Sequence, residues 1–230
     1  MTKMTTPSRK PAVPTRNRLK PRAFPALICG AGLRGQCQPA PNTPMAKLFF
    51  RYAAMNAGKS TALLQVAHNY EERGHRVRIF TARLDDRYGS GFVTSRLGPQ
   101  REVEQFDAGT DFIVLADEAP GIACILIDEA QFLSKRQVQQ LHELAHLRNL
   151  PAICYGLRTD FQGELFPGSA TLLALADEMD EMKTICDCGR KATMNMRVDA
   201  QNRKVTEGAQ VEIGGNARYR SVCGRCFHQG

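Results

Sequence analysis

The feature that most constrains the fold is the segment Ala53–Ser60, with the sequence AAMNAGKS. A short apolar run, Leu48–Tyr52, precedes it, and a helical pattern, Thr61–Ala67, follows it. A strand, a loop of small residues, Gly-Lys-Ser and then a helix is the layout of a phosphate-binding P-loop. Such a loop directs backbone N–H groups, the positive end of a helix and one lysine at phosphate oxygens. The motif normally opens with glycine, and Ala53 holds that place here, so the match is one residue short.

The P-loop predicts a site for a nucleoside triphosphate with its magnesium ion. Lys59 would reach the β- and γ-phosphates, and Ser60 would offer its hydroxyl to Mg²⁺. A chance Gly-Lys-Ser at the start of a helix is the alternative, which the strand before it and the helix after it disfavour. We therefore expect ATP to contact the loop residues Ala53, Ala54, Met55, Asn56, Ala57, Gly58, Lys59 and Ser60.

Two acidic residues, Asp128 and Glu129, close a continuous apolar run at Ile122–Ile127. A run without polar alternation is typical of a central parallel strand that is buried on both faces. The carboxyl end of such a strand faces the ligand crevice, here beside the P-loop. Asp128 would hold the magnesium through water, and Glu129 would take a proton from the group that attacks the γ-phosphate. The alternative is a solvated turn with no chemical role.

Strands and helices alternate over residues 45–182, which predicts an α/β domain with a doubly wound, mostly parallel sheet. Capping residues Asp111 and Ser134 mark the starts of helices at 112–119 and 135–148. Further helices are expected at 59–73 and 169–177, and further strands at 76–81, 101–106 and 151–156.

Residues 1–44 are rich in Pro and Arg, contain no Asp or Glu and show no hydrophobic periodicity. This composition predicts a disordered basic extension. Met45 just before the first strand would make a natural start, so our favoured interpretation is an over-extended reading frame. A genuine disordered tail is the second interpretation.

Four late cysteines are spaced like zinc ligands: Cys186, Cys188, Cys223 and Cys226. Two such pairs suit tetrahedral zinc in a structural site, because four thiolates leave no place for an activated water. The first pair has one intervening residue rather than two, and four unliganded thiols remain the alternative. We expect residues 183–230 to form a small zinc-binding domain. In contrast, Cys124 and Cys154 lie in apolar strand patterns and are expected to be buried.

The formal net charge of +8 does not indicate a nucleic-acid-binding core. Eight of the 31 basic residues lie before residue 45, which leaves 23 basic residues against the 23 acidic ones. A neutral core offers no electrostatic field that would steer DNA. No apolar run reaches the ~20 residues of a membrane helix, so we expect a soluble protein without a membrane partner.

Several segments together resemble the P-loop, zinc-containing (type II) thymidine kinases of the cytosolic and bacterial type. The matching stretches are 54–61, 85–89, 127–133, 154–166 and 212–223, in one order along the chain. The resemblance implies a RecA-like P-loop domain followed by a small zinc-binding domain with a lid loop. It also implies transfer of the γ-phosphoryl of ATP to the 5′-hydroxyl of thymidine or deoxyuridine, with Mg²⁺ and structural Zn²⁺ as cofactors.

The resemblance further assigns roles to individual residues. Glu129 matches the catalytic base, and Asp128, Ala130 and Gln131 match the strand-end motif that contacts ATP. The residues that match those flanking the transferred phosphate are Asp85 and Arg87. The residues that match the nucleoside pocket and its lid are Met55, Leu157, Phe161, Phe166, Val211, Glu212, Ile213, Gly214 and Tyr219. A cytoplasmic homotetramer with feedback inhibition by dTTP is also implied.

Two other classes of protein remain as alternatives. A DNA-dependent P-loop ATPase with a structural zinc site would use Glu129 to activate water instead of a nucleoside hydroxyl. The neutral core and the small size of the chain disfavour it. A non-catalytic zinc module with a vestigial P-loop is disfavoured because Lys59, Ser60, Asp128 and Glu129 are all present.

Overall fold

The computed structural model describes residues 45–83, 91–95, 98–211 and 218–230. Its centre is a six-stranded sheet with the order β5-β2-β6-β7-β1-β8, in which every neighbouring pair is parallel. The strands are β1 (Leu48–Ala53), β2 (Arg76–Ala82), β5 (Glu104–Phe106), β6 (Ile122–Ile127), β7 (Ala152–Leu157) and β8 (Glu178–Glu181). The predicted parallel α/β sheet is therefore confirmed. Strand β6, which Asp128 and Glu129 follow, lies in its interior.

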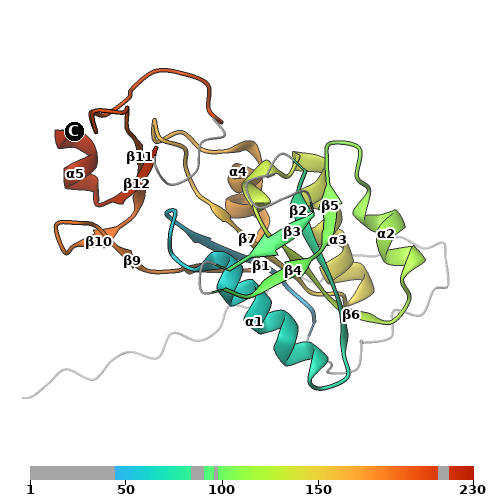
Figure 1. Cartoon of the computed structure of the whole chain (residues 1–230). Coiled ribbons are helices and arrows are strands. Elements are labelled where there is room, and N and C mark those ends of the chain that lie inside the picture. Colours follow the sequence, from blue (N-terminus) through green and yellow to red (C-terminus); the bar gives the residue numbers. More distant parts are fainter. Residues whose placement is uncertain (1–44, 84–90, 96–97, 212–217) are drawn as a thin grey trace, which may run out of the picture. The chain divides into compact units, whose positions relative to one another are not determined.

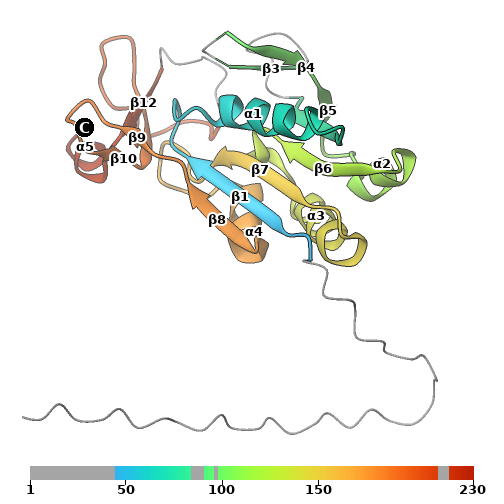
Figure 2. The same cartoon turned by 90° about the horizontal axis from the view of Figure 1, so that it is seen from below.

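Helices cover both faces of this sheet, as Figure 2 shows. Helix α1 (Lys59–Glu71) lies on one face, and α3 (Lys135–Arg148) and α4 (Pro167–Leu175) lie on the other. Two apolar clusters fill the layers between sheet and helices, one around Leu63 and Tyr155 under α1 and one around Leu141 and Leu172 under α3 and α4. Burial on both faces explains why the central strands are continuously apolar.

The predicted helix starts at Asp111 and Ser134 are both confirmed. Asp111 accepts hydrogen bonds from the N–H groups of Ile113 and Val114 at the start of α2 (Phe112–Glu118). Ser134 forms a reciprocal capping box with Gln137 at the start of α3. Such caps satisfy backbone donors that the first helical turn leaves unpaired.

The structure differs from the sequence-based expectation at three places. Helix α4 begins two residues earlier than expected, because Pro167 takes the first helical position, where its missing N–H is harmless. Strand β8, with the sequence EMDE, was not predicted, because its acidic residues suit only an exposed edge of the sheet. The single strand expected at 101–106 is two strands, β4 (Gln100–Glu102) and β5, and β4 pairs with β3 (Phe92–Thr94) as a separate ribbon.

The chain after β8 forms short antiparallel ribbons (Figure 1). One ribbon pairs β9 (Thr184–Ile185) with β10 (Lys191–Ala192), and the other pairs β11 (Met194–Arg197) with β12 (Tyr219–Val222). A final helix, α5 (Gly224–Gln229), packs with them around a small apolar cluster that includes Phe227. Among the described residues, no helix combines the length and apolar character needed to span a membrane.

Candidate active site

The loop between β1 and α1 contains two residues with a positive φ, Asn56 and Gly58. Gly58 has a φ of 78° in the left-handed region, and α1 begins at the next residue, Lys59. Open space surrounds the position of a Cβ at Gly58, so glycine is needed there for its conformation rather than for room. Ala53 is the last residue of β1 and has no positive φ, so its backbone does not require the glycine that usually opens the motif.

Ser60 connects the P-loop to the end of strand β6. Its hydroxyl Oγ donates a hydrogen bond of 2.8 Å to Oδ2 of Asp128. The side chain of Lys59 is almost buried, and its Nζ donates to the carbonyl oxygen of Ala54 at 3.3 Å. A hydroxyl and a carboxylate joined in this way can together hold a hydrated Mg²⁺, because both offer the oxygen ligands that this ion prefers.

Burial raises the pKa of Asp128, and the negative charge of the neighbouring Glu129 raises it further. The hydroxyl of Ser60 and the charge of Lys59 oppose this rise. A cation placed beside Asp128 would favour its ionised form, because opposite charges at close range stabilise each other. The environment therefore suits a carboxylate that ionises fully when a cation arrives.

Glu129 is held in a conformation that non-glycine residues rarely adopt, with a φ of 52°. Its N–H donates to Oδ1 of Asp128, and its carboxylate accepts a hydrogen bond from Nε2 of Gln131. Oε1 of Gln131 in turn accepts the N–H of Leu157, the last residue of β7. Backbone strain of this kind collects at functional sites, where the surroundings fix one orientation of a side chain.

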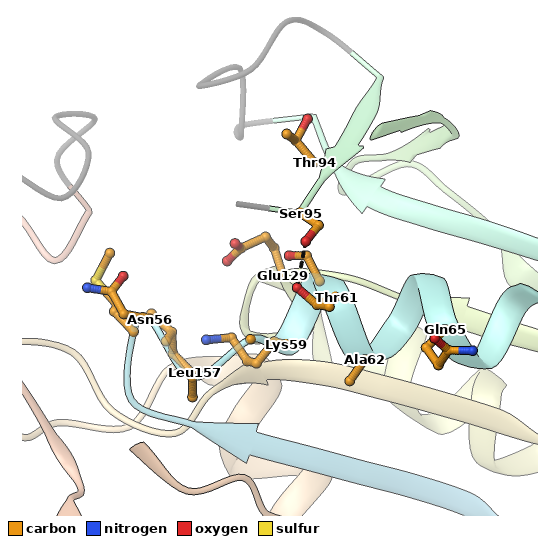
Figure 3. A pocket seen from close by; sticks show the side chains of 13 residues that line it. Asn56, Lys59, Thr61, Ala62, Gln65, Thr94, Ser95, Glu129 and Leu157 are labelled. Carbon is orange, nitrogen blue, oxygen red and sulfur yellow. Dashed lines mark hydrogen bonds between the residues drawn. The ribbon is translucent and has the colours of Figure 1, made fainter. Parts of the chain in front are cut away.

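A pocket of about 540 Å³ lies over the P-loop. This volume is in the range of small-molecule sites. Figure 3 shows the side chains of Lys59 and Glu129 extending from the start of α1 and the end of β6 into this space. The lining residues are Met55, Asn56, Ala57, Gly58, Lys59, Ser60, Thr61, Ala62, Gln65, Thr94, Ser95, Glu129 and Leu157. Residues 55–60 of the loop, Glu129 and Leu157 therefore meet at one cavity. The other predicted ATP-binding residues are buried and are not part of its lining: Ala53, Ala54, Asp128, Ala130 and Gln131.

Thr94, at the end of β3, and Ser95 line another part of the pocket. Oγ of Ser95, just after β3, lies 2.7 Å from Oγ1 of Thr61 in the first turn of α1 (dashed line in Figure 3). Thr94 and Ser95 were not expected at the site, because their segment carries no recognisable motif.

Gly168 packs closely against the turn that follows Glu129. The turn is the 3₁₀ helix η1 (Ala130–Phe132), which follows Glu129, and Gly168 lies in the first turn of α4. A Cβ at Gly168 would lie only 2.6 Å from the carbonyl oxygen of Ala130 and 2.7 Å from that of Leu133. Glycine is therefore the residue that allows α4 to approach the backbone of the turn this closely.

The ribbon of β11 and β12 is hydrogen-bonded to the P-loop at Met55. The N–H of Met55 donates to Oδ1 of Asn195 at 2.8 Å, and the carbonyl oxygen of Met55 accepts a hydrogen bond from the hydroxyl of Ser221. Nδ2 of Asn195 also donates to the carbonyl oxygen of Thr159, in the loop after β7. Two segments more than a hundred residues away in sequence thus fix one residue of the loop.

A buried arginine organises the neighbouring part of the structure. The guanidinium of Arg197 lies over the ring of Phe161, 3.8 Å from its centroid, and donates to the hydroxyl of Tyr219. It also donates to the carbonyl oxygen of Ala209. Stacking and directed hydrogen bonds are the two ways in which a guanidinium binds an aromatic residue. Arg197 therefore couples Phe161 and Tyr219, two of the predicted nucleoside-binding residues.

The remaining predicted residues lie in different surroundings. Phe161 and Phe166 are buried in the protein and are not part of the lining of the P-loop pocket, and Phe166 packs edge-on against Phe132. Val211 is exposed. Asp85, Arg87, Glu212, Ile213 and Gly214 lie outside the described residues.

The four late cysteines converge, as their spacing predicted. The sulfur atoms of Cys186, Cys188, Cys223 and Cys226 all lie within 4.8 Å of one another, and Cys188 Sγ is 3.6 Å from Cys223 Sγ. Thiolates bound to one tetrahedral zinc at ~2.3 Å would be separated by ~3.8 Å, so the cluster fits this ion. The cluster is compatible with zinc, as the sequence led us to expect.

The electrostatics of the cluster also suit a cation. Hydrogen bonding from the backbone of Cys226 lowers the pKa of Cys223 to about 6. The neighbouring thiols, Cys188 foremost, raise the pKa of Cys226 to about 12. The surroundings thus favour the ionised form of Cys223 and disfavour that of Cys226. A bound Zn²⁺ would favour ionisation of all four thiols.

Sequence reasoning missed Asn195, Arg197, Ser221 and Gly168. Asn195 and Arg197 are buried polar residues that need partners, but their burial becomes visible only in the folded chain. Gly168 and Ser221 gave no signal either, because their roles depend on close approaches that only the folded chain reveals.

Comparisons with known proteins give one consistent result. The family model described as thymidine kinase matches residues 46–227. A thymidine kinase of Chromobacterium violaceum is 65% identical over 184 residues, which cover 80% of this chain and 99% of the relative. Those of Agrobacterium fabrum and Yersinia pseudotuberculosis are 56% and 54% identical, over 79% and 80% of this chain and 95% and 96% of theirs.

One solved structure, the Pif1 helicase of Candida albicans, matches with a TM-score of 0.37 and 14% identity. The match covers 61% of this chain and 36% of the helicase. A likeness at this level says nothing about function.

Proposed function

The chain belongs to the thymidine kinase family, and we propose that it transfers the γ-phosphoryl group of ATP to the 5′-hydroxyl of thymidine or deoxyuridine. The product with thymidine is dTMP, a product of nucleotide salvage. The observation that carries the proposal is the hydrogen bond from Ser60 to Asp128, which joins a P-loop to an acidic strand end beside Glu129. These are the parts that phosphoryl transfer needs.

The donor side of the site would act mainly by positioning and by neutralising charge. The N–H groups around Gly58 and the start of α1 would bind the phosphates. Lys59 would exchange its contact with the carbonyl oxygen of Ala54 for the β- and γ-phosphate oxygens. The magnesium ion that accompanies ATP as part of the substrate would bind at Ser60 and Asp128 and offset the negative charge that develops.

Glu129 would accept the proton of the attacking 5′-hydroxyl. Its carboxylate extends into the pocket and is oriented by Gln131. A general base must lie within hydrogen-bond reach of the proton it removes, and a fixed side chain satisfies this condition better than a free one. Without a nucleoside, the same carboxylate could only activate water, so exclusion of water from the closed site would be important.

The acceptor would bind beside Met55, Leu157, Phe161, Phe166 and Tyr219, with the segment 211–219 covering the base. Support comes from the contacts that link Phe161, Arg197 and Tyr219, and from the two hydrogen bonds that tie Met55 to the ribbon of β11 and β12. Asp85 and Arg87 would flank the transferred phosphate. Residues 183–230 would serve as a zinc-binding domain, in which bound Zn²⁺ would fix the four thiolates and so the frame of this ribbon.

Three further properties belong to the same proposal. A triphosphate nucleotide such as dTTP could occupy the phosphate loop and inhibit the enzyme, because the loop binds phosphates rather than adenine. The family resemblance supports a homotetramer. The enzyme would act in the cytoplasm, where ATP and free nucleosides meet.

A single assay separates this function from a DNA-dependent ATPase. Release of ADP from ATP is followed with thymidine, with single- or double-stranded DNA, or with neither. The proposed function predicts release that requires thymidine and is unaffected by DNA. Release that DNA stimulates in the absence of thymidine would overturn it.

A further inference from the structure

We propose that His142, His146 and Asp177 form a second metal site, for a borderline divalent cation such as Zn²⁺ or Ni²⁺. The two histidines lie in the sequence His142-Glu143-Leu144-Ala145-His146 on helix α3. Residues four apart share one face of a helix, which is the spacing by which helices present a pair of imidazoles to one metal ion. The Cys₄ cluster and the P-loop do not involve these residues.

The third group comes from a different part of the chain. Asp177 lies between α4 and β8, and its Oδ2 is 3.1 Å from Nε2 of His146. The rings of His142 and His146 have centroids 4.3 Å apart. One ligand atom from each of the three residues lies within 4.8 Å of the others. Two ligands at ~2.1 Å from one metal ion are separated by ~3–3.4 Å at tetrahedral or octahedral angles, so small side-chain rotations would complete the site.

The ligands are oriented by the surrounding structure. Oδ2 of Asp177 also accepts the N–H of Leu48 at 2.8 Å, which fixes the carboxylate at the start of β1. Metal-binding carboxylates are commonly held by such an outer hydrogen bond. His146 and Asp177 are each about a quarter exposed, so a metal ion has access from solvent. Among the described residues, no hydrogen bond occupies the ring nitrogens of His142.

The charges around the site favour a cation. Glu143 adjoins His142 in sequence and adds a negative charge. Lys47 also acts on Asp177, but its ammonium group pairs with Glu178. Two imidazoles and one carboxylate are the donor set preferred by Zn²⁺, Ni²⁺ and Cu²⁺ rather than by Mg²⁺. A set of three protein ligands leaves at least one position for water.

A metal ion here would cross-link α3 to the segment between α4 and β8. Both helices lie on the same face of the sheet (Figure 2), and the residues at or just beyond their C-terminal ends, His146 and Asp177, lie near the start of β1. The P-loop follows the other end of β1. The site would therefore stabilise the fold without taking part in phosphoryl transfer. The proposal is limited to metal binding. The contacts described above involve only His142, His146 and Asp177, so Glu143 is given no catalytic role.

The test uses full-length protein without an affinity tag, with its Cys₄ cluster first saturated with zinc. Ni²⁺ is titrated calorimetrically, because it favours imidazole nitrogen over thiolate sulfur. We expect one Ni²⁺ per chain for the natural protein. His142→Ala should weaken this binding by more than the ~10–100-fold that loss of an outer partner costs. Ni²⁺ at a hundredfold excess over its dissociation constant should raise the Tm by ~5–10 °C, and only when the site is intact.

Two further variants test whether Ni²⁺ binds at this site rather than elsewhere on the protein. Asp177→Asn removes the anionic ligand but keeps an oxygen for the N–H of Leu48, so it should also lose Ni²⁺. His68→Ala is the matched control, because His68 is an exposed helical histidine that pairs with Glu72 four residues later, and it should bind Ni²⁺ normally. Thymidine phosphorylation by each variant reports correct folding independently. No Ni²⁺ bound by the natural protein, equal binding by His142→Ala, or one ion per two chains would each overturn the proposal.

Discussion

On the phosphate side of the site, residues that are neighbours in sequence act together, whereas on the nucleoside side the contacts join residues far apart. Ala53–Ser60 and Asp128–Gln131 are two short segments at the carboxyl ends of β1 and β6, the two strands that flank β7 in the sheet. In contrast, Met55 is held by Asn195 and Ser221, and Arg197 joins Phe161 to Tyr219. In the proposed function, the sheet would therefore supply the phosphate chemistry, and the ribbon of β11 and β12 would position the acceptor.

The largest expected effect is on the phosphate side. Glu129→Gln keeps the size of the side chain and its contact with Gln131 but removes the general base, which typically contributes ~10²–10⁴-fold to the rate. We expect kcat to fall by this factor while ATP binding is retained, as measured by steady-state kinetics and by titration of a fluorescent ATP analogue. Near-normal turnover would remove Glu129 from the mechanism.

The second effect is on the nucleoside side. Cys223→Ser should lose the zinc and loosen the ribbon that carries Asn195 and Ser221. We expect KM for thymidine to rise by roughly tenfold or more, equivalent to ~1.4 kcal/mol, while KM for ATP changes less. Zinc content is measured by atomic emission alongside the kinetics.

Asp187→Ala is the matched control for this variant, because Asp187 lies between two of the cysteines but does not belong to the cysteine cluster. Its zinc content and its KM for thymidine should be unchanged. Equal losses of thymidine and ATP affinity in Cys223→Ser would show that the two sides are not distinct.

The third effect tests the support of the catalytic turn. Gly168→Ala places a methyl group against the carbonyl oxygens of Ala130 and Leu133. Overpacking of this kind costs ~1–3 kcal/mol, so Tm should fall by ~2–10 °C. Gly109→Ala is the control, since a Cβ there would lie at an ordinary 3.4 Å from Asp107. An unchanged Tm for Gly168→Ala would show that α4 does not constrain the turn.

The fourth effect is a dependence of stability on pH. Because the pKa of Asp128 is raised in the folded protein, the folded state holds a proton that the unfolded state loses first. Stability without nucleotide should therefore fall as pH rises from the ordinary carboxylate range toward the raised pKa. Asp128→Asn should remove this loss, making the free protein more stable near pH 8 by ~1 kcal/mol or more, with no gain at acidic pH.

Urea denaturation of the two proteins in magnesium-free buffer, at pH 5 and at pH 8, measures this difference. Asp117→Asn changes an exposed carboxylate and should show no comparable gain. The same Asp128→Asn variant should lose phosphoryl transfer, because it lacks the anion beside Ser60. Equal pH dependence in Asp128→Asn and the natural protein would contradict the account of its burial.

The smallest effect joins the two sides. Asn195→Ala and Ser221→Ala each remove one hydrogen bond to Met55, worth ~0.5–1.5 kcal/mol. We expect kcat/KM for thymidine to fall by roughly two- to tenfold in each case. Asn69→Ala is the control, because Asn69 is an exposed asparagine on α1. Unchanged kinetics in both variants would mean that the ribbon does not hold the loop.

The same contrast explains what the sequence could predict. Strand and helix periods, the caps at Asp111 and Ser134, the P-loop and the acids after β6 are local signals, and the structure places each of them as expected. The backbone at Ala53 does not require the missing glycine, because that residue ends a strand and has no positive φ. Strand β8 escaped prediction because edge strands tolerate acidic sequences.

Contacts between distant segments could be predicted only where a motif marks both partners, as for Ser60 with Asp128 and for the four cysteines. Nothing in the sequence near Asn195, Ser221 or Gly168 says that they meet Met55 or the turn after Glu129. Each of these contacts depends on how whole helices and strands are positioned against one another, which is set only when the core packs. The approach of Asp177 to His142 and His146 could not be predicted either, because only the folded chain brings the residue before β8 next to α3.

The central claim is that a nucleoside, rather than water, receives the phosphoryl group at this site. The direct measurement follows the γ-phosphoryl of labelled ATP after incubation with the enzyme and thymidine, separating the products by chromatography. We predict that the label appears in dTMP in an amount equal to the ADP formed, with little inorganic phosphate when thymidine is left out. Label recovered as inorganic phosphate, whether or not thymidine is present, would contradict the account.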